Sequence, residues 1–124
     1  MSNNKSMIKL IHFCGRALTE YHYYSEAVKI WQAGITYKDK ESYLNLAKIY
    51  VTDLCTQHIA DIQHPIKVTP GICRGLIIDM WQNFPKDTVP FLKLLITLQN
   101  IPQEHRDFYK KLLNKKGENK YDIK

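Results

Sequence analysis

Residues 8–35 read IKLIHFCGRALTEYHYYSEAVKIWQAGI, and this stretch decides the class of fold. In its first half, apolar residues recur every three or four positions, at Ile8, Ile11, Cys14, Leu18 and Tyr21. Residues with this spacing lie on one face of an α-helix. The second half has a similar stripe, formed by Ala27, Val28, Ile30, Trp31 and Ile35. The stretch therefore predicts two paired helices, the second ending near Gly34, because glycine readily adopts the left-handed conformation that closes helices.

Two further stripes follow in the middle of the chain. The third runs over residues 43–62 and predicts a helix that ends near His64, because the next residue is a proline, which disfavours helical geometry before it. A fourth helix is expected to begin at Thr69 and Pro70, which are typical of an N-cap and a first turn, and to end at Pro85. Its expected inward residues are Ile72, Leu76, Ile77, Met80, Trp81 and Phe84.

The last third of the chain predicts two more helices. The fifth is expected to be capped by Asp87 or Thr88, with Pro90 tolerated in its first turn. Its expected inward residues are Phe91, Leu92, Leu95, Ile96 and Leu98. The sixth begins near Pro102 and carries Phe108, Leu112 and Leu113. Because no strand-like alternation or hairpin turn interrupts these segments, the sequence predicts an all-α fold of about six helices, as a short helical-repeat stack or a compact bundle.

Composition and length suit one globular domain. Of the 124 residues, 44% are hydrophobic and 24% are charged, as in folded proteins. We expect a single helical domain over residues 8–114, between a flexible N-terminus, 1–7, and a basic, frayed tail, 115–124. No apolar run approaches the roughly 20 residues that a membrane span needs, and no secretion signal is evident, so an intracellular protein is expected. Three widely spaced cysteines favour free thiols over disulfides.

Eight residues of the first helix pair occupy the preferred positions of a known repeat: Ile11, Cys14, Gly15, Leu18, Tyr24, Ala27, Trp31 and Gly34. The pattern restarts at Tyr43, Leu46, Ala47 and Tyr50. Over roughly residues 8–50 the chain thus resembles the tetratricopeptide repeat, a two-helix unit of about 34 residues. Small residues such as Gly15 allow helix backbones to approach closely, and Trp31 fills the space that remains. The resemblance implies stacked helix pairs that hold a peptide or helix in a groove, while an unrelated bundle with similar packing is the open alternative.

No set of residues in the sequence predicts catalysis. Cys55, His58 and His64 lack the second close pair of ligands that structural zinc sites use. Cys14 and His12 point in different directions on a helix, so the histidine does not activate the thiol. The glycine patterns of specific phosphate sites are also missing from the sequence. We therefore expect no enzyme, no metal ion and no cofactor.

The leading hypothesis is a protein-interaction adaptor or assembly subunit. Its expected contact residues are Tyr23, Tyr37, Lys29 and Lys48. Tyrosine is favoured at partner surfaces because it combines apolar area with a hydroxyl group. The net charge of +6 suits an acidic partner, and self-association is a further expectation.

The alternative hypothesis is a small, basic, helical protein that binds nucleic acid. Its phosphate contacts are expected to be Arg16, Lys29, Arg74, Lys93, Lys110, Lys111, Lys115 and Lys116. No helix-turn-helix or other reading motif accompanies these residues in the sequence. A membrane partner is not expected.

Overall fold

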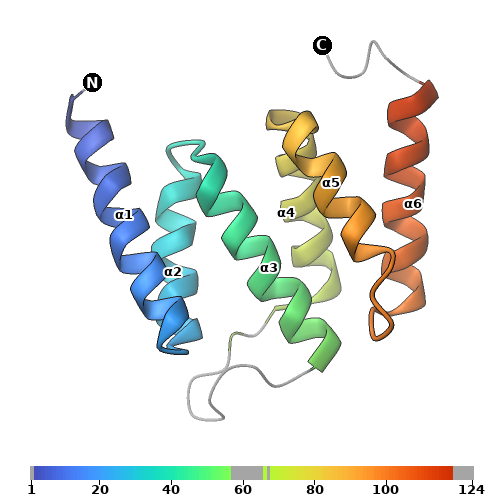
Figure 1. The fold of residues 1–124 in the computed structure, drawn as a ribbon, viewed down its shortest axis with the longest axis horizontal. Helices are drawn as coiled ribbons and strands as arrows, with labels where there is room; N and C mark the ends of the chain where they lie inside the picture. The colour runs from blue at the N-terminus through green and yellow to red at the C-terminus, as the bar shows by residue number, and fades with distance from the viewer. Residues whose placement is uncertain (1, 57–65, 67, 119–124) are drawn as a thin grey trace. The chain divides into compact units, whose positions relative to one another are not determined.

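The computed structural model describes residues 2–56, 66 and 68–118, and their regular structure is entirely helical. Its helices, shown in Figure 1, are α1 (Ser2–Glu20), α2 (Tyr24–Ile35), α3 (Lys40–Thr56), α4 (Pro70–Asn83), α5 (Pro85–Leu95) and α6 (Gln103–Glu118). The prediction of an all-α fold is therefore confirmed. The expected end of the third helix near His64 lies outside the described residues.

The helices at the two ends of the described chain reach further than the sequence predicted. α1 begins at Ser2 instead of Ile8, and α6 extends to Glu118. The division into a flexible start, one domain and a frayed tail stays a prediction, with its bounds at 1–7, 8–114 and 115–124.

Contacts between Cα atoms divide the chain into two compact units, Met1–Thr69 and Pro70–Lys124. In the N-terminal unit, α2 packs against both α1 and α3. In the C-terminal unit, α5 packs against both α4 and α6. Each unit is thus a run of consecutive helices in which the middle helix contacts both neighbours.

The core of the N-terminal unit forms around Trp31, which is fully buried. Its ring lies against the backbone of α1 at Gly15, where an added Cβ atom would lie 2.6 Å from two ring carbons. The indole Nε1 donates a hydrogen bond to Thr19 Oγ1 at 3.2 Å, and that hydroxyl donates to the Gly15 carbonyl oxygen at 2.7 Å. The buried indole is therefore satisfied, and the expected close packing of Gly15 and Trp31 is confirmed.

Gly34 lies at the end of α2, as the sequence predicted, but it packs closely against α3 and does not close the helix through a left-handed conformation. It does not have a positive φ, and α2 continues to Ile35. A Cβ atom at position 34 would overlap Ser42 Oγ and lie 2.6 Å from Ser42 Cβ. Ser42 itself is fixed, because its amide and hydroxyl both donate to Asp39 Oδ2, the side-chain cap of α3. Gly34 therefore allows α2 and the first turn of α3 to approach closely.

Both helix connections of the N-terminal unit pass through a left-handed residue that is not glycine. His22 has a φ of 68° and Lys38 a φ of 56°. In each connection, the amide of the following residue donates back to a carbonyl oxygen of the preceding helix, at Leu18 and Gly34 respectively. These are the hydrogen bonds of the Schellman motif, which satisfy carbonyl groups at a helix end.

The boundary between α4 and α5 differs from the predicted one. α5 begins at Pro85. Proline has no N–H group, but the N–H of the first helical residue has no partner within the helix, so no hydrogen bond is lost. Thr88 lies inside the helix, fully buried, and its hydroxyl donates to the Phe84 carbonyl oxygen at 2.7 Å. The prediction of a cap at Asp87 or Thr88 was wrong, because the proline itself starts the helix.

The inward face of α4 agrees with the prediction at Ile77 and Met80 and differs from it in the first turn. Ile72, expected inside, is 51% exposed. The buried residues of α4 are Cys73, Ile77 and Met80.

Cys73 Sγ lies 3.8 Å from the hydroxyl oxygen of Tyr109 in α6, and His105 Nδ1 lies 3.1 Å from the same oxygen. Because His105 is buried, its pKa is lowered, so its neutral form is favoured in this polar cluster.

Candidate partner-binding face

α1 carries two apolar faces, and only one of them is covered by the N-terminal unit. The covered face lies against α2 and includes Ile11 and Gly15. We call the other one the outer face of α1, formed by Met7, Leu10, Phe13, Cys14, Ala17 and the following Tyr21. Leu10 is 54% exposed and Phe13 is 72% exposed, which are high values for apolar side chains of this size.

Tyr21 was expected on the inward face and is instead 71% exposed, so that prediction was wrong. An α-helix turns by about 100° per residue, so a position thirteen residues after Ile8 is rotated by about 220° beyond whole turns. Intervals of three and four residues keep neighbours together but let a long stripe drift around the helix.

An apolar groove of about 340 Å³ borders the outer face on the side of α2. Its lining residues are Met7, Leu10, Ile11, Cys14, Ile30, Ala33, Thr36 and Tyr37. Nearly all of this lining is apolar, with the hydroxyl groups of Thr36 and Tyr37 at the end of α2. A groove of this size and chemistry accommodates one or two apolar side chains of a partner.

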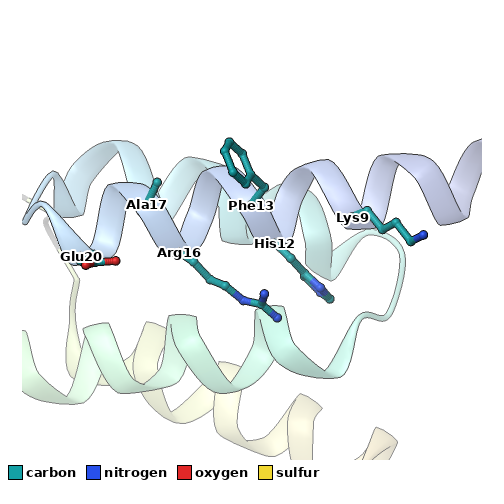
Figure 2. Close-up of a pocket in the computed structure, with 6 residues that line it drawn as sticks. All are labelled: Lys9, His12, Phe13, Arg16, Ala17 and Glu20. Carbon is teal, nitrogen blue, oxygen red and sulfur yellow. The ribbon is translucent and has the colours of Figure 1, made fainter.

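A second hollow borders the outer face on its other side, as Figure 2 shows. It is lined by Lys9, His12, Phe13, Arg16, Ala17 and Glu20. His12 and Arg16 extend toward α3, whereas Phe13 and Ala17 point to the opposite side of α1 (Figure 2). His12 Nε2 lies 2.8 Å from Asp39 Oδ2, so this edge of α1 is joined to the start of α3 by polar contacts.

Arg16 is engaged by Glu41 of α3 in a two-pronged ion pair. Its Nε donates to Oε2 at 2.6 Å and its Nη2 donates to Oε1 at 2.7 Å. These hydrogen bonds and the attraction of the charges raise the pKa of Arg16 and lower the pKa of Glu41. A phosphate group would have to displace Glu41 to bind this guanidinium in the same way.

The four residues predicted to contact a protein partner lie at different places in the N-terminal unit. Tyr37 lines the groove between α1 and α2. Lys29 is exposed on α2, four residues before the groove residue Ala33 and therefore on the same side of that helix. Tyr23 is 61% exposed at the turn between α1 and α2. Lys48 is exposed on α3 and does not line this groove.

The predicted phosphate contacts are divided between the two units. Arg16 and Lys29 belong to the N-terminal unit, and the others belong to the C-terminal unit. There, Lys93 is exposed in the last turn of α5, and the exposed lysines of α6 include Lys110, Lys111 and Lys115. The Arg74 guanidinium lies 5.8 Å from the centre of the Phe108 ring, in a cation–π contact. Lys116 belongs to α6, but its side chain lies outside the described part of the chain.

Metal-ligating chemistry is not found in the described ranges. Among residues 2–56, 66 and 68–118, no three His, Cys, Asp or Glu side chains form a group that could hold a metal ion. Cys55 is half-buried on α3, and burial raises the pKa of its thiol. Its suggested companions His58 and His64 lie outside the described residues. Each helix within the same ranges is too short or too polar to cross a membrane.

No family model, no curated protein and no solved structure matches the chain.

The residues that sequence reasoning missed are Leu10 and Phe13. The sequence contains a signal for a second apolar face at Leu10, because Met7, Leu10, Cys14, Ala17 and Tyr21 follow one another at intervals of three, four, three and four; Phe13 lies outside this stripe. This is the spacing of a helix that packs against another helix along a seam. It lies directly beside the inward stripe and shares Cys14 and Tyr21 with it, so the spacing alone does not separate the two faces.

Proposed function

We propose that the N-terminal unit is a protein-interaction module that binds an amphipathic helix of a partner protein along the outer face of α1. The observation that carries this proposal is the exposure of Leu10 and Phe13 beside the apolar groove between α1 and α2. Exposed apolar patches of this kind mark interaction surfaces, and helices dock into such grooves through residues spaced by three and four.

The charge at the edge of the groove favours a partner helix that carries a carboxylate beside its apolar stripe. Lys29 lies one helical turn before the groove residue Ala33 and is exposed. A partner helix with aspartate or glutamate beside its apolar stripe brings a carboxylate to this lysine. Such edge charges contribute mainly to specificity and to the rate of association, while the buried apolar side chains contribute most of the affinity.

The resemblance to the tetratricopeptide repeat supports the same reading. In the N-terminal unit, the preferred small positions at Gly15, Ala27 and Gly34 are buried in close helix packing. Helical-repeat units use their surfaces to hold peptides and helices of other proteins. We propose a repeat-like adaptor or assembly subunit on this basis.

Leu10→Asp is expected to weaken binding of a helical partner at least about tenfold, because burial of a leucine side chain contributes roughly 1.5–3 kcal/mol. The probe is a fluorescein-labelled acidic peptide with leucines at intervals of three and four residues, and the readout is fluorescence anisotropy. A peptide of the same composition in scrambled order is the control for helical amphipathicity.

The matched control variant is Leu94→Asp on α5, because Leu94 is 57% exposed and Leu10 is 54% exposed. Both variants place a new charge on an exposed helix surface, and circular dichroism verifies that both remain helical. Equal binding by the wild type and the Leu10 variant, or equal binding of the ordered and scrambled peptides, contradicts the proposal.

A second candidate function, nucleic-acid binding, rests on the exposure of Lys110, Lys111 and Lys115 on α6. If α6 binds phosphates, the logarithm of the binding constant for duplex DNA or single-stranded RNA decreases linearly with the logarithm of salt concentration. Replacing these three lysines with glutamate then reduces the slope of the logarithm of the binding constant against the logarithm of salt concentration. On duplex DNA, the reduction is about 0.9 for each phosphate contact that is lost. Absence of binding at low salt rejects this candidate and leaves the helix-binding proposal untouched.

A further inference from the structure

The outer face of α1 has opposite charges at its two ends. Lys9 and Glu20 are both exposed, both line the hollow of Figure 2, and lie on the same edge of the outer face. They are separated by about three helical turns. Phe13, 72% exposed, lies between them, and Leu10 and Ala17 continue the apolar surface on its other side.

This arrangement is complementary to itself when the helix is reversed. In an antiparallel pair of identical helices, a residue near one end of α1 faces a residue near the other end of its copy. A pair centred near Cys14 places Lys9 of each copy beside Glu20 of the other, so two opposite-charge contacts form. In a parallel pair, one edge of each helix faces the opposite edge of its copy, so Lys9 and Glu20 lie on the far side from their counterparts and neither contact forms.

We infer that the helix bound by the outer face of α1 is α1 of a second copy of this chain, in antiparallel orientation. This inference rests on the proposed function, because it names the partner of the same face. Leu10 of one copy packs near Ala17 of the other, and the two Phe13 rings fill the centre of the interface. Phe13 also lies near Arg16 of the second copy, where its ring contacts a guanidinium already oriented by Glu41.

The resulting interface is the kind that twofold dimers use, in which the same patch of both copies contacts itself. The two pairs of α1 and α2 then form a four-helix arrangement around an apolar centre. In this arrangement, the groove residues of α2 lie at the margin of the contact. The dimer covers the exposed apolar side chains that the isolated N-terminal unit leaves in water.

The test exchanges the charges at positions 9 and 20. Sedimentation velocity of the full chain over a range of concentrations then measures dimerisation. The wild type is expected to form dimers as concentration increases. Lys9→Glu and Glu20→Lys each create two repulsive contacts and are expected to weaken dimerisation about tenfold. The double variant, which exchanges both charges, is expected to restore it. Lys86→Glu, at an exposed position of α5, is the control and leaves dimerisation unchanged.

Mixing the two single variants provides the second measurement. A heterodimer of Lys9→Glu with Glu20→Lys has opposite charges at both contacts, so the mixture is expected to dimerise about tenfold more tightly than either variant alone. A wild type that remains monomeric at all concentrations overturns the inference, and so does a double variant that is no better than the single ones. The helix-binding proposal fails separately, when Leu10→Asp leaves peptide binding unchanged or when the ordered and scrambled peptides bind equally.

Discussion

Replacing Trp31 with alanine is expected to lower the free energy of unfolding of the N-terminal unit by about 3–5 kcal/mol. The side chain is fully buried, and its ring covers the backbone of α1 at Gly15. Alanine leaves a cavity between α1 and α2 and removes the donor that pairs with Thr19 Oγ1. Urea unfolding followed by circular dichroism measures the change, with the free energies extrapolated to water.

Trp81→Ala is the matched control, because Trp81 is only half-buried and lies on α4 in the other unit. The loss of stability is expected to be smaller, since part of the ring is already in contact with water. A loss at Trp31 that does not exceed the loss at Trp81 contradicts the central role of Trp31 in packing α2 against α1.

Gly34→Ala is expected to destabilise the same unit by about 2–3 kcal/mol, because overpacking a close contact forces side chains and backbone apart. The new methyl group would overlap Ser42 Oγ, and Ser42 is fixed by its hydrogen bonds to Asp39. Thermal and urea unfolding of the variant and the wild type measure this cost.

Two comparison variants make this result specific. Gly75→Ala on α4 is expected to increase stability by about 0.5–1 kcal/mol, since nothing lies within 4 Å of the added Cβ atom and alanine is the better helix former. Gly34→Ala combined with Ser42→Gly is expected to recover part of the loss, because the obstacle is removed. If Gly34→Ala and Gly75→Ala have the same effect, the close approach of α2 and α3 at Gly34 is wrong.

Most of the helix content was predictable from the sequence, because both the stripes and their stops are local features. Pro70, for example, marks the start of α4 as expected, since proline suits a first helical turn. The ends of α1 and α2 lie close to the predicted ones, but the left-handed residues that close them, His22 and Lys38, were not predictable in this way. Neither residue has a strong preference for the left-handed conformation, which is stabilised here by hydrogen bonds of the helix end.

The candidate site was predictable only in fragments. Tyr37 was expected to contact a partner and lines the groove, and Lys29 lies at its edge, but Leu10 and Phe13 were not among the predicted residues. Tyr37 and Lys29 were predicted as contact residues because of their residue types, whereas a leucine or phenylalanine is not recognisable by type as an exposed contact residue. In a sequence, it is indistinguishable from a residue of the core.

The sequence by itself determined that this chain is helical and that Gly15 and Trp31 lie where two helices pack closely. Only the tertiary structure decided which apolar stripe of α1 remains uncovered. The covered and outer stripes have the same intervals and similar residues, so helical periodicity does not distinguish them. The distinction arises when Trp31 of α2 packs over Gly15, because this contact fixes the rotation of α1 and leaves Leu10 and Phe13 on the open side.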